Sequence, residues 1–488
     1  MNMQMPLDKL PYDHAKFVDR VPEWQLVVSK AQKLANRQPE DKRVVIFHGA
    51  RGSGKSWLLR ESEYQLERSL TNVPSVYIDL AETSVQLANA AAEKASLAQL
   101  DRADLRQKLD AHFNETDLRV LCFDLGADYE NLPGRAKVEK IISLIEYLEH
   151  RVRIVELLRA CCTQRPNVAW NLSETRTELV SAALRGLIHQ IRQVIQAKTG
   201  PSPIQASETE NLEVLTDALV SDVRRVGAAI LLFDHTSESP PDLLGLLEEQ
   251  CLAPLAVLPK VLIVLAGRGE YHWKSVELRF KSEEYDLQNF DLSCTQEQLE
   301  KQVDQPALSA EDIHLLSAGY PWSNYILGTT ASRVAALDKC ANFLLSGLPI
   351  SANDRAYMET LCVLRAFVDE MVPNMLAAYF DDPNRLTTGY RQCREIRQAL
   401  TGTTLVKWVE ESGGYVIDEA LSHVLENLLY ERDRPKWIRL HTAACNLYKE
   451  WVDKYPRTAD RWQKEVNYHD GKLMHGPLWT PPNQEEMK

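Results

Sequence analysis

The segment that constrains the fold most is a glycine-rich loop at residues 49–56. Its sequence, GARGSGKS, fits the pattern GxxxxGK[ST] in full. The apolar run VVIF at residues 44–47 comes before it and is expected to be a strand buried on both faces. A stretch of helical periodicity starts directly after it, at Trp57. A strand, a glycine-rich turn and a helix in this order place backbone N–H groups around phosphate oxygens. The sequence therefore predicts an α/β fold with a phosphate-binding loop.

The residues of this loop have separate expected parts in holding a nucleotide. Lys55 is expected to reach the β- and γ-phosphates, and the Ser56 hydroxyl to join the ligands of a Mg²⁺ ion. The glycines permit backbone conformations that are costly for other residues. The implied cofactors are ATP or ADP with Mg²⁺. The candidate nucleotide-binding residues of the segment are Gly49, Arg51, Gly52, Ser53, Gly54, Lys55, Ser56 and Trp57.

Three further apolar runs, at residues 76–80, 228–234 and 261–266, predict the other strands of a parallel sheet. Asp234 ends one of them and is expected to hold Mg²⁺ from the end of a strand next to the loop strand. An aspartate at that point could instead cap a turn. Arg268 follows the last run, at the sheet edge where open α/β folds bind ligands, and is a candidate γ-phosphate sensor. The alternative is a surface arginine after a strand.

Glu238 is the candidate hydrolytic base. The residue after Asp234 is His235, and Glu238 lies close enough along the chain to polarise the attacking water. Glu238 could equally be the acidic start of the next helix, and His235 a solvated loop residue. Slow ATP hydrolysis is therefore expected, and a scaffold that binds nucleotide without turnover is an alternative.

The composition excludes several other classes of function. The 488 residues include 56 Lys and Arg against 69 Asp and Glu, a net charge of -13, which argues against a surface built for nucleic acid. No apolar run approaches the ~20 residues that a membrane-spanning helix needs. The first residues, MNMQMPLDKLPYDH, have neither the basic start nor the apolar stretch of a secretory signal. The nine cysteines are scattered without metal-ligand spacing, so we expect a cytoplasmic protein with reduced thiols.

Beyond the loop, further motifs resemble the STAND-type signalling ATPases, the AAA+/ORC-related branch of P-loop NTPases that includes NACHT and NB-ARC proteins. Residues 17–24, FVDRVPEW, are similar to the family's entry motif F-V-G-R-E-x-E-L, with Asp19 and Val21 as departures. The stretch from Asp234 to Arg268 resembles the family's Walker B to sensor 1 region. The tripeptide GYP that ends at Pro321 stands where the family carries G-x-P. The resemblance implies that Pro321 and the region around Arg20 flank the adenine base.

A long insertion separates the second and third predicted strands. The residues between 80 and 228 far exceed what a crossover needs, and apolar periodicity within residues 96–171 predicts an all-helical bundle. The stretch LRVLCFDLGADYENLPG at residues 118–134 resembles a prokaryotic effector-associated domain, a death-like adaptor. The resemblance implies an effector protein with a matching domain as partner. A helical insertion without a partner is the alternative.

The C-terminal part resembles a winged helix. Helices are expected at residues 357–367, 372–380 and 390–400, followed by two short strands around a glycine turn. The wing ends at Asp418 without the histidine of the NB-ARC motif. Arg391, Arg394 and Arg397 leave a DNA-binding ATPase, an initiator or transcription regulator, as an alternative, although the acidic surroundings argue against it.

Together these patterns predict an α/β P-loop NTPase with a parallel sheet, an inserted all-α death-like bundle, and C-terminal helical and winged-helix domains. The expected function is an ATP-dependent switch in prokaryotic immune or cell-death signalling that recruits or clusters effectors and could form nucleotide-dependent homo-oligomers. The expected domains are a discontinuous core (1–95 and 172–290), the insertion (96–171), a helical lid (291–350), the winged helix with C-terminal helices (351–475) and a disordered tail (476–488).

Overall fold

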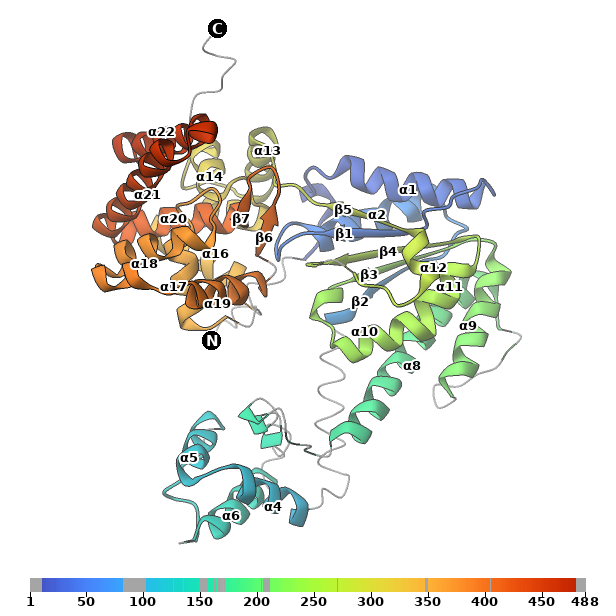
Figure 1. The fold of residues 1–488 in the computed structure, drawn as a ribbon. Helices are drawn as coiled ribbons and strands as arrows, with labels where there is room; N and C mark the ends of the chain where they lie inside the picture. Colours follow the sequence, from blue (N-terminus) through green and yellow to red (C-terminus); the bar gives the residue numbers. More distant parts are fainter. Residues whose placement is uncertain are drawn as a thin grey trace.

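A five-stranded parallel sheet forms the centre of the N-terminal part of the molecule (Figure 1). Its strands lie in the order β2-β3-β4-β1-β5, with bounds β1 (Val44–His48), β2 (Ser75–Asp79), β3 (Ala229–Asp234), β4 (Val261–Gly267) and β5 (Ser282–Asp286). The computed structural model describes residues 11–81, 102–125, 127–134, 136–149, 157–158, 160–161, 164–165, 168, 170, 172–202, 204, 211–269, 271–346, 350–403 and 405–479. Because every pair in the sheet is parallel, the carboxyl ends of all strands meet at one edge. The predicted α/β fold is confirmed.

Side chains of the strands alternate between two apolar layers, as the pleat of a strand requires. Val44 and Ile46 of β1 belong to one layer, and Val45 and Phe47 to the other. The second layer is covered by α1 (Val21–Ala35) and α2 (Lys55–Ser69). The first is covered by α8 (Leu172–Thr199), α9 (Leu212–Val226), α10 (Pro241–Leu247), η3 (Glu248–Leu252), α11 (Ala253–Val257) and α12 (Val276–Lys281).

The sheet departs from the sequence prediction at two points. The strand that ends in Asp234 was expected to lie next to the loop strand. Instead, β4 lies between β1 and β3. β5 was not predicted because its sequence, SEEYD, is charged. It is an edge strand that, among the described strands, pairs with β1 alone. Its glutamates contact basic side chains: Glu283 lies 2.7 Å from Lys30 Nζ, and Glu284 lies 2.7 Å from His48 Nε2.

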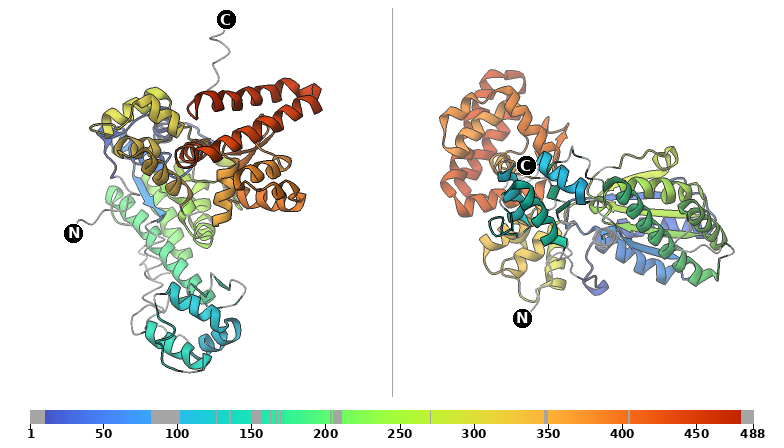
Figure 2. Two further views of the ribbon diagram at one scale, coloured as in Figure 1. Left: turned by 90° about the vertical axis from the view of Figure 1, so that its left-hand side faces the viewer. Right: turned by 90° about the horizontal axis from the view of Figure 1, so that it is seen from below.

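A separate helical bundle is inserted between β2 and α8. Its described helices are α4 (Arg102–His112), α5 (Glu115–Asp124) and α6 (Lys137–Glu149). They enclose their own apolar core, which includes Leu109, Phe113, Leu121, Ile141 and Leu148 and shares no residue with the layers of the sheet. Figures 1 and 2 show this bundle at the far end of α8, away from the sheet.

The C-terminal part consists of helices and one antiparallel hairpin of β6 (Val406–Val409) and β7 (Gly414–Ile417). A single apolar core runs from Leu299 to Val466 and crosses residue 350, where two domains were expected to meet. None of the helices described is long and apolar enough to cross a membrane. The helices are α13 (Leu292–Gln302), α14 (Ala310–Ser317), α15 (Pro321–Thr329), α16 (Arg333–Leu345), α17 (Ala352–Leu361), α18 (Val372–Phe380), α19 (Tyr390–Thr401), α20 (Glu419–Arg432), α21 (Arg434–Lys454) and α22 (Ala459–His475).

Residues 476–479 pack against α22. The Trp479 ring lies over Gly471, where an added Cβ would come within 2.3 Å of the indole. Trp479 also stacks on His475, with ring centroids 6.1 Å apart, and Lys472 donates a hydrogen bond to the Pro477 carbonyl. These four residues, which belong to the segment expected to be a disordered tail, thus pack against the helix before them. Residues 480–488 lie outside the described residues.

Candidate nucleotide-binding site

The phosphate loop leaves β1 and enters α2 at Lys55. Gly52 and Gly54 have φ angles of +90° and +93°, in the region that favours glycine. An added Cβ at Gly52 would lie 2.7 Å from the Cβ of Trp322 and 2.8 Å from a ring carbon of Phe343. Glycine is thus needed at this position for its backbone conformation and for the close approach of α15 and α16. The loop is in direct contact with the predicted lid.

Lys55 folds back over the loop. Its Nζ donates hydrogen bonds to the carbonyl oxygens of Gly49 and Ala50, both at 2.7 Å, and lies 3.2 Å from Ser53 Oγ. These contacts hold the ammonium group within the turn, beside the first N–H groups of α2. Positive charge beside the N-terminus of a helix favours an anion such as a phosphate.

The Asp234 carboxylate lies at the carboxyl edge of the sheet and is 1% exposed. The Tyr77 hydroxyl donates to its Oδ2 at 2.7 Å, and the His235 backbone N–H donates to its Oδ1 at 2.7 Å. Burial and the neighbouring carboxylate raise the pKa of Tyr77, so its hydroxyl stays protonated and remains a donor. Two donors therefore fix the orientation of this carboxylate beside the loop.

His235 connects the loop to this carboxylate and to a second one. Its Nε2 lies 3.4 Å from Ser56 Oγ, and its Nδ1 lies 2.9 Å from Asp79 Oδ1 and 3.4 Å from Asp234 Oδ2. Its φ of +54° is uncommon for a histidine. The sequence analysis missed this contact and named a solvated loop residue as one interpretation of His235. The available signal was Asp79 at the end of another predicted strand, which pairs in register with Asp234.

The two residues predicted to be catalytic lie on the same edge of the sheet. The backbone N–H of Arg268, just after β4, lies 2.5 Å from Ser237 Oγ and donates to it. Burial raises the pKa of Tyr320 well above its usual value, and the nearby charges of Arg268, Arg20 and Arg51 oppose this rise. The charges of these three arginines are therefore close enough to act on the Tyr320 hydroxyl. Glu238 ends the short helix η2 (Thr236–Glu238), and its side chain lies outside what the structure describes.

Arg20 is buried and stabilises the loop through hydrogen bonds to backbone carbonyl oxygens. Its guanidinium donates to the carbonyl oxygens of Ser53 at 3.2 Å and Gln288 at 2.5 Å, and it lies 5.1 Å from the Phe290 ring centroid. Pro321 is buried at the start of α15, and its carbonyl oxygen accepts a hydrogen bond from Gln298 at 2.8 Å. Both predicted base-flanking residues therefore lie in the packed surroundings of the loop.

Arg51 and Trp57 point to other neighbours. The Arg51 guanidinium lies 4.8 Å from the Phe343 ring centroid and donates to Ser346 Oγ, while the Arg51 carbonyl accepts from the Tyr320 hydroxyl. Trp57 packs edge-on against Tyr12, with ring centroids 5.8 Å apart. In this structure Arg51 thus joins the loop to the lid, and Trp57 contacts the N-terminal segment.

The donor set at the loop fits a nucleotide with Mg²⁺. In the parts of the chain that the structure describes, no group of three or more His, Cys, Asp and Glu side chains could hold a metal ion by itself. Ser56 and Asp234 supply oxygen atoms from two sides, and Mg²⁺ commonly completes such a set with nucleotide phosphates and water. The chemistry of these residues therefore suits an ion that arrives with a nucleotide.

The inserted bundle matches a known family. Residues 105–166 match the family model described as effector-associated domain 7. The chain carries an effector-associated domain. The expectation drawn from the stretch at residues 118–134 is confirmed, and such a domain implies protein partners.

Solved structures of low identity are similar to this chain over most of its length. A Walker-type ATPase of Pyrococcus abyssi is 14% identical, with 86% of this chain and 99% of that chain covered and a TM-score of 0.41. The Aeropyrum pernix ORC2 protein is 12% identical, with 87% and 97% covered and a TM-score of 0.36. A STAND protein with a tetratricopeptide repeat sensor from Pyrococcus horikoshii is 10% identical, with 98% and 56% covered and a TM-score of 0.28. No curated protein matches the chain.

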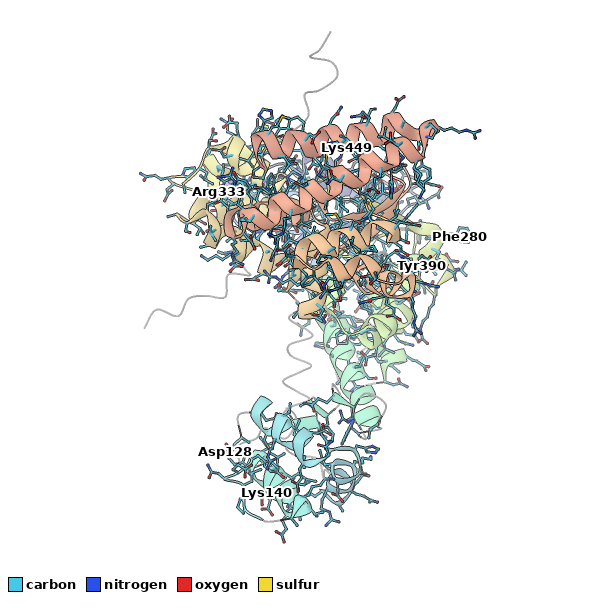
Figure 3. All side chains as sticks on the ribbon, turned by 60° about the vertical axis from the view of Figure 1, so that its left-hand side comes forward. Asp128, Lys140, Phe280, Arg333, Tyr390 and Lys449 are labelled. Atoms are coloured by element: carbon cyan, nitrogen blue, oxygen red, sulfur yellow. The ribbon has the colours of Figure 1, made fainter. Side chains whose placement is uncertain are left out.

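The effector-associated domain is held together at its characteristic turn by Lys140. The Lys140 ammonium group donates to the carbonyl oxygens of Tyr129 at 2.9 Å, Glu130 at 3.2 Å and Leu132 at 2.7 Å. Asp128 orders the same turn from its start, since its Oδ1 accepts from the Glu130 N–H at 3.0 Å. Figure 3 shows Asp128 and Lys140 on the same small bundle. The turn is therefore a fixed feature of the domain surface.

Proposed function

We propose that this protein is an ATP-dependent molecular switch that recruits or clusters effector proteins through its effector-associated domain. The observation that carries the proposal is the contact of Gly52 with Trp322 and Phe343. In this proposal a nucleotide held by the loop acts on this contact. The loop can therefore report its nucleotide state to the whole C-terminal part, because lid and winged-helix region share one core.

In this proposal Lys55, Ser56 and Asp234 hold ATP or ADP with Mg²⁺. The metal, when bound, would neutralise charge on the phosphates and orient them. Lys55 would exchange its loop carbonyl partners for phosphate oxygens. Arg268 would respond to the γ-phosphate and Glu238 would polarise the attacking water. Hydrolysis is expected to be slow, because a histidine, His235, and not an acidic residue directly follows Asp234.

The effector-associated domain supplies the output. It folds around its own core and stands away from the sheet at the end of α8 (Figure 1), so its surface is available to a partner. A partner protein with a matching domain is the expected effector. If nucleotide-bound chains assemble, several copies of the domain are presented together, which can raise apparent affinity by ~10²–10⁴ without new contacts.

The setting proposed for this switch is prokaryotic immune or cell-death signalling in the cytoplasm. The effector-associated domain and the resemblance to STAND-type ATPases support the signalling role. The acidic balance of the chain and its scattered cysteines support the location.

The alternative of a DNA-binding ATPase has less support. On α19, Arg397 pairs with Asp369 at 2.8 Å, and Arg391 pairs with Glu395 at 3.0 Å. Carboxylates beside these arginines reduce the positive charge that the helix could offer to phosphates.

The test is the molecular mass in solution, measured by light scattering with ADP and with a slowly hydrolysed ATP analogue. Growth in mass with the ATP analogue alone, absent in Lys55→Ala, would support the switch. A monomer under all conditions, with nucleotide binding demonstrated separately, would contradict ATP-driven assembly of the chain by itself. Addition of a candidate effector that carries a matching domain would then decide whether the chain recruits it without prior assembly.

A further inference from the structure

The candidate site contains a side chain that stands between its two expected metal ligands. One imidazole nitrogen of His235 lies 3.4 Å from Ser56 Oγ, and the other lies 3.4 Å from Asp234 Oδ2. The second nitrogen also lies 2.9 Å from Asp79 Oδ1. A carboxylate can only accept, so Nδ1 carries a proton, and Nε2 shares a hydrogen bond with the Ser56 hydroxyl. The imidazole therefore ties the loop to the ends of β2 and β3.

Two features of the backbone hold His235 in this position. Asp79 and Asp234 are partners in the register of β2 and β3, so both carboxylates face the ring from adjacent strands. The His235 residue adopts a φ of +54°, and the Asp234 carboxylate accepts its N–H at 2.7 Å. The residue is thus anchored at its backbone and at Nδ1, and its Nε2 reaches Ser56 of the loop.

The Ser56 hydroxyl and the Asp234 carboxylate are also what a Mg²⁺ ion would use. Mg²⁺ takes oxygen ligands in a strict geometry, whereas imidazole suits zinc, copper, iron and nickel. An ion that binds both oxygens has to displace the ring from Ser56. The nucleotide phosphates themselves, held by Lys55 and the loop N–H groups, have no need to displace it.

We propose that His235 is a positioning residue that competes with Mg²⁺ at this site and makes nucleotide binding only weakly dependent on the metal. The inference rests on the proposed nucleotide-binding function. It predicts that the metal-free nucleotide complex is unusually persistent, since the His235 bridge takes over the contact that the ion would otherwise make between loop and sheet.

The test is equilibrium binding of a fluorescent ADP analogue, with saturating Mg²⁺ and with a chelator. For the wild type we expect the two affinities to agree within about threefold. In His235→Asn the shorter side chain cannot span Ser56 and Asp79, and asparagine tolerates a left-handed backbone. This variant is expected to bind about tenfold more tightly with Mg²⁺ than with the chelator, the scale of one hydrogen bond.

A second variant and a matched control make the result specific. Asp79→Asn keeps an oxygen for the Ala81 N–H, which lies 2.9 Å away, but removes the charge that holds the ring. It is expected to change the metal dependence in the same direction. His272→Asn makes the same substitution as the first variant at an exposed histidine and is expected to have no effect.

The outcomes separate this inference from the proposed function. If His235→Asn leaves the ratio of the two affinities unchanged or weakens binding with Mg²⁺, the competition is refuted. If Lys55→Ala binds the analogue as tightly as the wild type under both conditions, the nucleotide site itself is refuted. Thermal unfolding of each variant shows whether it is folded before its affinity is compared.

Discussion

The contact between the phosphate loop and Phe343 predicts that the lid holds the nucleotide in place. Phe343 stacks on Trp322 with ring centroids 4.5 Å apart, and the Arg51 guanidinium lies 4.8 Å from its centroid. Phe343→Ala removes both interactions and leaves Gly52 without its neighbouring ring carbon. We expect the lid to open more readily and to release nucleotide faster.

The size of the effect follows from the lost contacts. The pair with Trp322 lies within the lid and is kept when the lid opens, so it is not counted. The cation–π contact with Arg51 at a partly exposed site contributes about 0.5–1 kcal/mol. Burial of half a phenyl side chain adds about 1–1.5 kcal/mol. The total of about 1.5–2.5 kcal/mol corresponds to a change of about 10-fold to about 70-fold in the ratio of closed to open lid.

The assay is the dissociation rate of a fluorescent ADP analogue chased with unlabelled nucleotide. Phe343→Ala is expected to release it at least about tenfold faster than the wild type. Phe280→Ala is the matched control, because Phe280 of α12 is 74% exposed and lies on the outer face of the molecule (Figure 3). A rate within about threefold of the wild type, in a folded variant, would refute the reasoning that these contacts hold the lid.

Two further changes test the packing. Gly319→Ala is expected to destabilise the C-terminal part by about 2–4 kcal/mol, because φ is +71° and the new Cβ would lie 1.9 Å from the Phe290 carbonyl oxygen. Its thermal midpoint should fall, whereas Gly245→Ala, with no atom within 4 Å of the added Cβ, should not lower it. Burial, and then the nearby His441, hold the pKa of His469 well below its usual value. Its neutral form therefore contributes stability above about pH 6.5 that is lost on acidification, since the unfolded state takes up the proton. The fall in thermal midpoint between pH 7.5 and 5.5 should be smaller in His469→Gln; an equal fall would assign it to other groups.

Much of the sheet could be predicted because its buried strands are apolar over their whole length. The runs around Ile46, Ile230 and Ile263 leave no alternative to a strand between two layers. β5 gives no such signal, because its glutamates are stabilised by Lys30 and His48, which lie far away in the sequence. The order of the strands in the sheet could not be predicted either, since it depends on packing between residues that are distant in the chain.

In the C-terminal part, too, the bounds of some helices could be predicted from the sequence and those of others could not. The predicted helix at residues 372–380 coincides with α18, whereas the one expected at 357–367 lies at Ala352–Leu361. Its apolar end was assigned to the helix, but Phe367 forms a bridge to Tyr415 of β7 through two backbone hydrogen bonds of 2.8 Å. Apolar periodicity alone cannot distinguish the end of a helix from an extended residue buried by a distant hairpin.

In the candidate site, the local sequence predicted the phosphate loop. It also predicted that Asp234 stands at the end of a buried strand. It could not predict the His235 bridge, because that contact joins Ser56 to a residue 179 positions away and depends on the paired ends of β2 and β3. Nor did it predict that Arg51 would contact Phe343, since the helical region that supplies this ring comes much later in the chain.

The continuous apolar core from Leu299 to Val466 has a mechanical consequence. Helices that share one core cannot shift past each other without losing packed contacts, so α13 to α22 should turn as a single lever. The chain crosses from the sheet to this lever once, between Leu287 and Leu292, and the loop lies beside that crossing, where Arg20 donates to the Gln288 carbonyl. If the part from α13 to α22 rotates about this crossing, a small displacement at the phosphate loop produces a larger one in the helices that lie farther from the crossing.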